Sequence, residues 1–332
     1  MMTKIAINGF GRIGRAAFKI ALEQKNIKVV AINDLTDNKT LAHLLKYDTV
    51  YGEYNKNITY TDKELVVDKQ KILSFAEKDP NQLPWKKLGV DVVLECTGIF
   101  RDPVSAGLHL KAGAKRVIIS APPKSDDEVK NIVLGVNFKD YNPKTDKIIS
   151  NASCTTNCMA PVAKVLHDKF GIVKAMANTI HSYTADQNLV DGPHKDLRRA
   201  RTAGQNIIPT STGSAIAVAK VIPALQGKMT SVAYRVPTAC VSLIEFVAEL
   251  GKPATAEQIN NAFISAAKKE LLDILMVTSD ELVSSDFIGN PYSAIVDMKL
   301  TESLGGNLVK VVAWYDNEWG YSNRLVELAG LV

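Results

Sequence analysis

The sequence has few of the features that mark secreted or membrane-spanning proteins. It contains only 4 cysteines in 332 residues, and their spacing follows no extracellular disulfide pattern. The longest apolar runs, such as residues 29–32 and 309–314, are much shorter than the ~20 residues of a membrane-spanning helix. The opening residues, MMTKIAINGF, lack the basic and long apolar regions of a secretion signal. We therefore expect a cytoplasmic protein with reduced thiols and no membrane role.

Charge of neither sign dominates. The chain has 40 Lys and Arg against 35 Asp and Glu, a net charge of +5, which favours anionic ligands only weakly. The basic run DLRRAR at 196–201 is compatible with a second hypothesis, a nucleic-acid-binding protein. Its charge-driven contacts would be nonspecific, so no specific nucleic-acid partner is expected. Ordinary globular usage, with 46% hydrophobic and 23% charged residues, together with the length, predicts two folded domains.

The first 150 residues alternate short apolar runs with helical segments. Residues 3–8 form an apolar run that ends at a Gly-rich segment, a helical pattern follows, and a second apolar run covers 27–34. This order predicts a βαβ unit. Further apolar runs at 90–96, 116–120, 132–136 and 147–150 predict more strands of a doubly wound α/β domain with a parallel sheet.

The pattern changes after Ser150. A long helical stretch from Cys154 to Lys169 precedes longer strand-like runs at 232–250, 293–303 and 307–317, and Gly305-Gly306 is a hairpin signal. Residues 255–270 read as an amphipathic helix that begins at a Thr cap. We expect an α+β domain with a mainly antiparallel sheet over residues 153–317. The other domain would be Rossmann-like, covering 1–152 and completed by a C-terminal helix at 318–332.

The segment NGFGRIGR at 8–15 contains a Gly-x-Gly-x-x-Gly motif, formed by Gly9, Gly11 and Gly14. Placed between a strand and a helix, such a motif allows a tight turn, close approach of the backbone to a pyrophosphate and close helix packing. Asp34 ends the next strand, where a carboxylate would bind the ribose hydroxyls of NAD and repel the extra phosphate of NADP. The alternative is a Gly-rich turn followed by a capping Asp. We expect NAD as cofactor.

The segment SNASCTTNCMAP places Cys154 at the start of a helix. Peptide N–H groups and the helix dipole would stabilise a thiolate there, lower the thiol pKa and produce a nucleophile. Cys158, one turn further on, is expected to be structural. The alternatives are a zinc half-site, for which no further ligands are found nearby, and a redox pair, which more often has two intervening residues. No metal is expected.

A thiol nucleophile needs a base, and His181 at the end of an apolar run is the candidate. The alternative is a core or surface histidine, because the sequence does not place it beside Cys154. Thr212 and Gly213 precede a helical segment, a favourable position for a phosphate. Arginines of the 196–201 run could add charge-assisted bonds, or the run could be a solvated charged segment.

Seven segments of the sequence stand in an order that resembles the phosphorylating glyceraldehyde-3-phosphate dehydrogenase family, of the bacterial glycolytic type. They are NGFGRIGR, the strand end at Asp34, SNASCTTNC, HSYT, PTSTG, RVPT and WYDNEWGYSNR, and they cover almost the whole chain. The resemblance implies a homotetramer that oxidises glyceraldehyde 3-phosphate with NAD and inorganic phosphate to 1,3-bisphosphoglycerate. The segment 191–201 is similar to a loop that in the family reaches across a subunit boundary.

The resemblance also implies roles for individual residues. Cys154 would be the nucleophile, which forms a hemithioacetal and then a thioester, and His181 would be the base. The cofactor would contact Arg12 and Ile13 at the pyrophosphate, Asp34 and Lys78 on the adenosine side, Ser120 at the nicotinamide ribose and Asn317 at the carboxamide. One phosphate pocket would involve Thr184 and Arg235, the other Ser153, Thr155, Thr212 and Gly213, with Arg199 beside or between them.

Three positions depart from the family pattern. Lys78 stands where many relatives have Arg, Ile216 stands where Lys is usual, and Thr238 is not followed by the usual Pro-Asn. None of these changes removes a residue with an assigned chemical role. An enzyme that acts on erythrose 4-phosphate would share the fold and the Cys/His pair, and is the alternative within the enzyme class.

Overall fold

The computed structural model describes residues 2–124 and 129–332, which divide into two compact units. The first unit comprises Met1–Ile132, Lys139–Ala152 and Ser322–Val332, and the second comprises Val133–Phe138 and Ser153–Tyr321. In the described part of the chain, no helix combines the length and the apolar character needed to cross a membrane.

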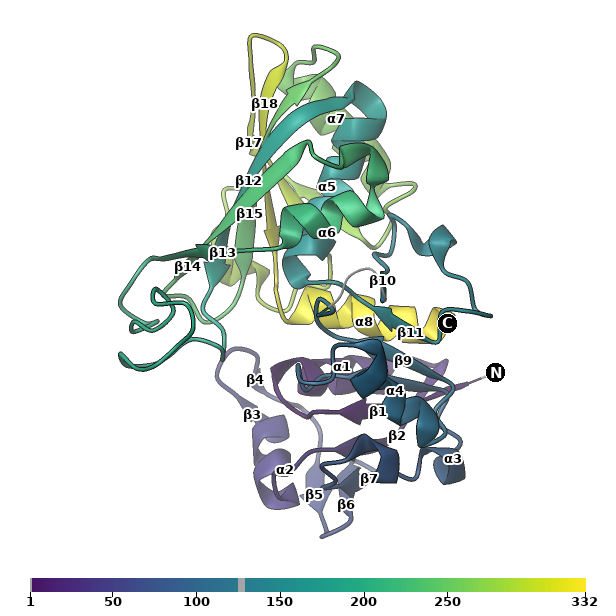
Figure 1. Ribbon diagram of the computed structural model, residues 1–332. Coiled ribbons are helices and arrows are strands. Elements are labelled where there is room, and N and C mark those ends of the chain that lie inside the picture. The colour runs from purple at the N-terminus through teal and green to yellow at the C-terminus, as the bar shows by residue number, and fades with distance from the viewer. Residues whose placement is uncertain (1, 125–128) are drawn as a thin grey trace. The chain divides into compact units, whose positions relative to one another are not determined.

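The sheet of the first unit has nine strands over the described residues, in the order β10-β11-β9-β8-β1-β2-β7-β6-β5 (Figure 1). All neighbours from β10 to β7 pair in parallel, which confirms the predicted doubly wound class. Strands β7, β6 and β5 continue the sheet as antiparallel neighbours. The strands are β1 (Thr3–Asn8), β2 (Ile27–Asn33), β5 (Ile58–Tyr60), β6 (Glu64–Val67), β7 (Gln70–Phe75), β8 (Val92–Glu95), β9 (Arg116–Ile119), β10 (Lys130–Asn131) and β11 (Ile148–Ser150).

Local capping signals set where the helices of this unit begin. Asp37 accepts a hydrogen bond from Thr40 N–H at 3.0 Å at the start of α2, and Asp102 accepts one from Ser105 N–H at 2.8 Å at the start of α4. Helix α1 begins directly after Gly11, without a side-chain cap. The helices are α1 (Arg12–Glu23), α2 (Asn38–Lys46), α3 (Trp85–Leu88) and α4 (Pro103–Lys111), and a two-stranded ribbon joins β3 (Tyr47–Asp48) to β4 (Gly52–Glu53).

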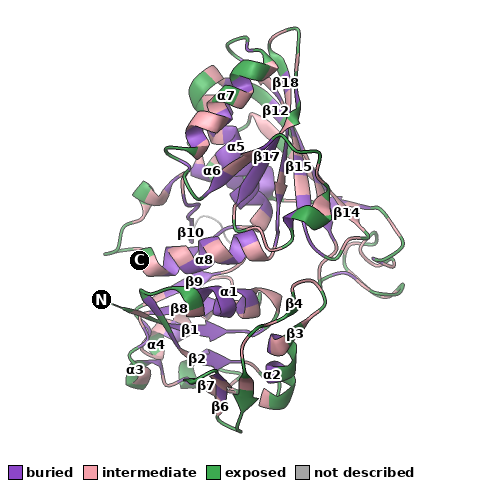
Figure 2. Ribbon diagram, turned by 180° about the vertical axis from the view of Figure 1, so that it is seen from behind, coloured by how far each residue is buried: buried purple, intermediate pink, exposed green. Residues whose placement is uncertain are grey.

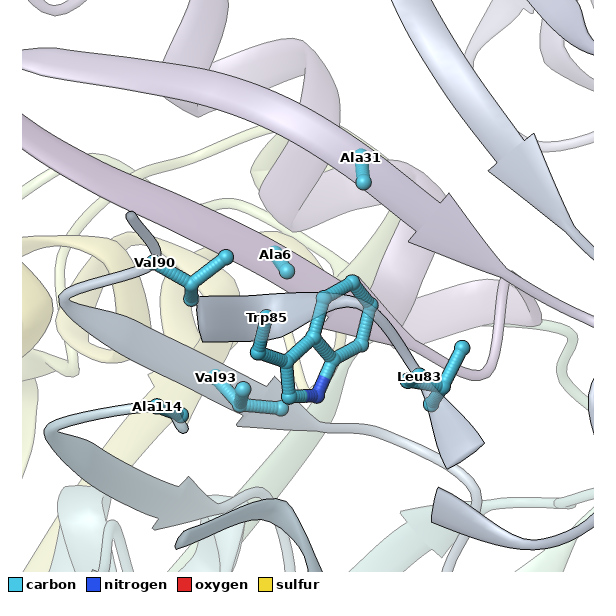
Figure 3. Close-up of a cluster of buried hydrophobic side chains, with 7 residues drawn as sticks. All are labelled: Ala6, Ala31, Leu83, Trp85, Val90, Val93 and Ala114. Carbon is cyan, nitrogen blue, oxygen red and sulfur yellow. The ribbon is translucent and has the colours of Figure 1, made fainter. Parts of the chain in front are cut away.

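The central strands of the sheet are buried, as Figure 2 shows for β1, β2 and β8. This is expected where helices cover both faces of a parallel sheet. The indole of Trp85 is fully buried and packs on one face of the sheet among small and branched side chains (Figure 3). Its neighbours in this cluster are Ala6, Ala31, Leu83, Val90, Val93 and Ala114.

The second unit contains a sheet of seven described strands in the order β13-β14-β12-β15-β18-β17-β16. Only β12 with β14 and β16 with β17 pair in parallel, so the predicted mainly antiparallel sheet is confirmed. Gly305 and Gly306, with φ of 61° and 84°, form the predicted hairpin turn between β17 and β18. The strands are β12 (Ile172–Ser182), β13 (Ile208–Ser211), β14 (Met229–Val236), β15 (Ser242–Leu250), β16 (Leu275–Thr278), β17 (Ala294–Leu304) and β18 (Leu308–Tyr315).

Three helices pack on one side of this sheet, as both ribbon views show (Figures 1 and 2). They are α5 (Cys154–Phe170), α6 (Ser214–Val221) and α7 (Ala256–Ala267). A capping box formed by Thr255 and Gln258 opens α7, which confirms the predicted Thr cap. The last helix is α8 (Trp319–Leu331), whose residues from Ser322 onward belong to the first unit.

One predicted strand is wrong. Residues 132–136 do not extend a strand beyond β10, which ends at Asn131. They form a turn in which Val133 N–H donates to Asn137 Oδ1 at 2.8 Å. Gly135 has a φ of +79°, and a Cβ there would lie 2.8 Å from Leu271 Cδ2. The run is apolar because the turn is buried, not because it is extended.

Candidate active site and cofactor cleft

The three glycines of the Gly-rich turn differ in what surrounds them. Gly9 has a φ of +90°, and a Cβ there would lie 2.7 Å from the backbone nitrogen of Thr97. A Cβ at Gly14 would lie 2.1 Å from the carbonyl oxygen of Gly9. Gly11 has no heavy atom within 4 Å of its Cβ position. Two glycines are therefore needed to build the turn, and the third leaves open space above the backbone where α1 begins.

A cleft of about 560 Å³ opens beside this turn. It includes Gly9, Gly11, Asp34 and Lys78 among the predicted cofactor residues. Asp34 is held against the turn, because its Oδ2 accepts a hydrogen bond from Phe10 N–H at 2.7 Å. Sequence reasoning missed the rest of the lining, which lies at or just beyond the ends of neighbouring strands: Asn8, Asn33, Leu35, Glu77, Cys96, Thr97, Ile99 and Phe100.

The other predicted cofactor residues of this unit do not line the cleft. Ile13 lies in the first turn of α1. The guanidinium of Arg12 pairs with Asp48 at 2.5 Å and lies 5.5 Å from the centre of the Tyr51 ring. Ser120 forms a hydrogen bond with the Cys96 thiol. Burial raises the pKa of that thiol to about 12. The open backbone at Gly11, the helix N-terminus and the Asp34 carboxylate together fit the pyrophosphate and ribose of a dinucleotide.

In the second unit, Cys154 is the first residue of α5, as predicted. The helix is capped by Ser153, whose Oγ accepts a hydrogen bond from Thr156 N–H at 3.0 Å. Ala152 has a φ of 55°, a conformation uncommon for a residue with a side chain, so the chain turns sharply just before the thiol. Cys158 is fully buried, and burial raises the pKa of its thiol. Of the two cysteines, Cys154 is partly exposed and Cys158 is buried.

The fold brings His181 to Cys154. The sulfur of Cys154 lies 3.5 Å from His181 Nε2, near the end of β12. Arg235 is the register partner of His181 on the parallel strand β14, and its Nη1 lies 2.7 Å from His181 Nδ1. The carbonyl oxygen of Ser182 also lies 2.7 Å from Nδ1. Since Nδ1 has both a donor and an acceptor beside it, the imidazole can carry its proton on either nitrogen.

Burial dominates the electrostatics of this pair. It raises the pKa of the Cys154 thiol, and the positive charge of Arg235 and hydrogen bonds with Thr155 offset only part of that rise. It also lowers the pKa of His181 to about 3, with a further contribution from the charge of Arg235. At neutral pH the resting pair is therefore a thiol and a neutral imidazole. Burial outweighs the helix N-terminus, contrary to the prediction from sequence.

Three buried donors of the second unit have unfilled hydrogen-bonding capacity. The Nε of Arg235, the Nε2 of Gln187 and the Oγ1 of Thr238 have no hydrogen-bond partner among the described residues. Gln187 is held beside the predicted Thr184, because Thr184 N–H donates to Gln187 Oε1 at 3.3 Å. Unpaired buried donors are costly, and an anionic oxygen would satisfy them. Sequence reasoning missed Gln187, which no motif marks.

The remaining predicted phosphate residues have partners within the second unit. Arg199 pairs with Asp186 at 2.6 Å and donates to Thr210 Oγ1 at 2.9 Å. Thr155 Oγ1 lies 2.9 Å from the hydroxyl of Tyr315. Thr212 and Gly213 stand at the N-terminus of α6, which packs against α5. The structure therefore gathers two helix N-termini and two arginines in the same unit as the thiol.

Asn317 is anchored by two hydroxyl groups. Ser182 Oγ and Ser242 Oγ donate to its Oδ1 at 3.0 and 3.2 Å. Because the oxygen of the amide is occupied, its Nδ2 remains the end that can donate to another group. The preceding residue, Asp316, accepts hydrogen bonds from Glu318 N–H and Trp319 N–H and so holds the start of α8.

Two family models match the chain. Residues 3–103 match the model described as glyceraldehyde 3-phosphate dehydrogenase, NAD binding domain, and residues 153–317 match the C-terminal domain of the same enzyme. With the Gly-rich turn and the thiol beside an imidazole, these matches define the class of protein: an NAD-dependent oxidoreductase.

Curated relatives match the chain over almost its full length. The chain is 53% identical to glyceraldehyde-3-phosphate dehydrogenase of Geobacillus stearothermophilus over 332 residues, covering 100% of this chain and 98% of the relative. It is 55% identical to glyceraldehyde-3-phosphate dehydrogenase 1 of Bacillus cereus over 328 residues, covering 99% and 98%. The chain belongs to the glyceraldehyde-3-phosphate dehydrogenase family, and its cofactor is NAD.

Proposed function

We propose that the protein oxidises glyceraldehyde 3-phosphate, in the presence of inorganic phosphate, to 1,3-bisphosphoglycerate by means of Cys154. The observation that carries the proposal is the contact between the Cys154 sulfur and His181 Nε2 at 3.5 Å, with Arg235 beside the same imidazole. A thiol paired with a base is the arrangement that forms and resolves acyl-enzyme intermediates.

The first half of the reaction makes a thioester. The Cys154 sulfur bonds to the aldehyde carbon, and His181 carries the thiol proton to the carbonyl oxygen, which yields a hemithioacetal. His181 Nε2 then removes the hydroxyl proton as a hydride leaves the same carbon. NAD, when bound, supplies the hydride acceptor. The Ser182 carbonyl, which accepts from Nδ1–H, stabilises the imidazolium that forms.

The second half transfers the acyl group. An oxygen of inorganic phosphate bonds to the thioester carbon and gives up its proton to solvent, the carbon–sulfur bond breaks, and the departing sulfur takes the proton held by His181. The charge that develops on the acyl oxygen is stabilised by the imidazolium and by backbone N–H groups at the start of α5. The resting thiol and neutral imidazole are thereby restored.

Two anion sites serve these steps. Arg235 and Thr184 bind one phosphate group, and the unpaired buried donors of Arg235 and Gln187 support this assignment. The second phosphate group is bound by Ser153 and Thr155 at the N-terminus of α5 and by Thr212 and Gly213 just before α6. Arg199 contributes charge beside these sites.

The cofactor residues follow from the cleft of the first unit. Backbone N–H groups of Arg12 and Ile13 hold the pyrophosphate above the open space at Gly11, Asp34 binds the adenosine ribose and Lys78 lies beside the adenine. The Asp34 carboxylate disfavours the 2′-phosphate of NADP. We assign the nicotinamide ribose to Ser120, and the carboxamide to Asn317.

We assign NAD binding to residues 1–152 with the C-terminal helix 318–332, and catalysis to residues 153–317. The assembly is a homotetramer. The loop at 183–207 supports this, because Leu189, Val190, Leu197 and Ile207 are 82%, 74%, 81% and 69% exposed, more than an isolated surface needs. A reactive thiol nucleophile suits the reducing cytoplasm. Light scattering of the purified protein tests the tetramer, and a monomer at micromolar concentration would contradict it.

The thioester can be trapped. Enzyme mixed with glyceraldehyde 3-phosphate and NAD, without inorganic phosphate, should form one equivalent of NADH per chain and carry an acyl group on the Cys154 peptide by mass spectrometry. Cys158→Ala, which changes the buried thiol, should give the same result. An acyl group found elsewhere, or none, contradicts the mechanism. A larger kcat/KM for erythrose 4-phosphate than for glyceraldehyde 3-phosphate would contradict the substrate.

A further inference from the structure

A buried carboxylate lies behind the cofactor cleft, and the mechanism makes no use of it. Glu95 ends β8 and is 1% exposed, and His109 on α4 beside it is fully buried. A carboxylate out of water is costly unless hydrogen bonds satisfy its oxygens. Glu95 meets this requirement with four donors, so the interior of the first unit provides a hydrogen-bonded site for this carboxyl group.

The direction of each hydrogen bond in this cluster is fixed. Trp85 Nε1–H, which can only donate, donates to His109 Nδ1 at 3.0 Å. The imidazole proton is therefore on Nε2, which donates to Glu95 Oε2 at 3.1 Å. Asn8 Nδ2 donates to the same oxygen at 2.6 Å. The Trp85 ring lies in the apolar cluster of Figure 3, so the far end of the chain of hydrogen bonds is anchored in the core.

From Glu95 the hydrogen bonds lead into both walls of the cleft. On one side Asn33 Nδ2 donates to Asn8 Oδ1 at 2.7 Å, and Asn33 Oδ1 accepts from Glu77 N–H at 2.9 Å, next to Lys78. On the other side Glu95 Oε1 accepts from Thr97 N–H at 2.8 Å and from the Thr97 hydroxyl. The residues that these hydrogen bonds reach all line the cleft: Asn8, Asn33, Glu77 and Thr97.

The Thr97 hydroxyl extends the second wall. It accepts a hydrogen bond from Ile99 N–H at 3.0 Å, which orders the loop after β8. The backbone nitrogen of Thr97 is also the atom that a Cβ at Gly9 would meet at 2.7 Å, so the same residue limits the Gly-rich turn. One carboxylate thus holds the strand ends β1, β2 and β8 in a fixed relation.

We infer that Glu95, oriented by His109, is a positioning residue for NAD: it preorganises the two walls of the cofactor cleft and sets the affinity for the dinucleotide without touching it. Preorganised walls lower the cost of ordering side chains when a ligand binds. The inference rests on the assignment of this cleft to NAD.

The sharpest test is Glu95→Gln, which keeps the shape and removes the charge. A Gln amide has one acceptor oxygen where Glu95 has two, so its NH₂ must face either Thr97 N–H or the donors of Asn8 and His109. One wall loses its anchor. We expect the NAD dissociation constant, measured by calorimetry, to rise about tenfold, the lower end of what loss of an outer-shell partner costs. The kcat at saturating NAD and the KM for glyceraldehyde 3-phosphate should stay within twofold.

Two further variants separate positioning from stability. Thr97→Val keeps the backbone bond to Glu95 but removes the hydroxyl, which donates to Glu95 and accepts from Ile99 N–H. We expect the loss of these two hydrogen bonds to raise the NAD dissociation constant about threefold or more. Trp85→Phe removes the donor to His109 and loosens the core cluster, yet leaves all four donors on Glu95. It should lower the melting temperature with NAD affinity within twofold of the wild type.

The outcomes are distinct. Folded Glu95→Gln that binds NAD within twofold of the wild type overturns the inference. The inference is also overturned if the NAD dissociation constant rises in proportion to the loss of melting temperature in all variants, Trp85→Phe included. The role of Glu95 would then be merely structural. If Glu95→Gln does not fold, the NAD dissociation constants of Thr97→Val and Trp85→Phe are compared instead. The inference holds only if the constant rises in Thr97→Val and stays within twofold of the wild type in Trp85→Phe. Wild-type protein that fails to bind NAD refutes the cofactor assignment instead.

Discussion

Two glycines of the Gly-rich turn should respond to alanine in opposite ways. At Gly14 an added Cβ would lie 2.1 Å from the Gly9 carbonyl oxygen, a backbone atom that cannot rotate away. At Gly11 it would meet no heavy atom within 4 Å, and the φ of −74° is open to any residue. Gly14→Ala should therefore damage the fold, whereas Gly11→Ala should damage only what binds above the turn.

The magnitudes follow from these contacts. Forcing a methyl group into packed backbone costs about 3 kcal/mol, and at about 3 °C per kcal/mol for a unit of this size Gly14→Ala should melt about 10 °C below the wild type. For Gly11→Ala, the loss of a favourable capping residue is about offset by the reduced entropy of the unfolded chain, so its melting temperature should change by about 2 °C or less.

Melting curves with and without NAD provide the assay. NAD at about 100 times its dissociation constant stabilises a binding-competent protein by about 2.7 kcal/mol, or about 8 °C by the same conversion. Wild-type protein should show that rise and Gly11→Ala should show almost none. If Gly11→Ala keeps the full NAD-dependent rise, the pyrophosphate does not lie over Gly11. A wild-type melting temperature for Gly14→Ala would refute the steric argument.

Four further predictions concern the second unit and the cofactor. Cys154→Ser should lower phosphate-dependent NADH formation at 340 nm by about 1000-fold or more, with Cys158→Ala as the active control. Folding lowers the pKa of His181 to about 3, so the unfolded chain binds this proton before the folded chain does as the pH falls below 6.5. Between pH 6.5 and 3, His181→Gln should therefore lose about 1.4 kcal/mol less stability per pH unit than the wild type, as measured by urea titrations. The same pH dependence of stability in both proteins would argue against the buried neutral imidazole. Arg235→Gln should move thiol alkylation by iodoacetamide to higher pH, because the guanidinium charge lowers the pKa of Cys154, and a move to lower pH would contradict this. Asp34→Asn should bring the kcat/KM for NADP closer to that for NAD, and an unchanged ratio would remove Asp34 from cofactor discrimination.

Local signals were enough for much of the fold. The Gly-rich turn between β1 and α1, the helix that begins at Cys154 and the hairpin at Gly305-Gly306 depend on residues close in sequence, so their patterns could be read directly. Strands β5 to β7 were not predicted: β5 and β7 show little alternation in burial, and β6, which does alternate, is only four residues long. The turn at 132–136 was mistaken for a strand because burial, rather than extension, makes it apolar.

The site shows where sequence reasoning ends. Cys154 and His181 could be nominated by type, but their 3.5 Å contact depends on packing between α5 and β12. Arg235 meets His181 through the long-range register of parallel strands, which no local pattern encodes. The direction of the thiol pKa was wrong for a similar reason, since the helix N-terminus is visible in sequence and burial is not. Polar residues at or just beyond the ends of buried strands, such as Asn33 and Thr97, were the missed signal for the cleft.

The most direct test of the central claim is the absorbance at 340 nm of purified protein with glyceraldehyde 3-phosphate and NAD, recorded with and without inorganic phosphate. We predict a burst of about one NADH per chain without phosphate and sustained turnover once phosphate is added, because the thioester on Cys154 then has an acceptor. Sustained turnover that does not depend on phosphate, or no NADH from folded protein with a titratable Cys154, would contradict it.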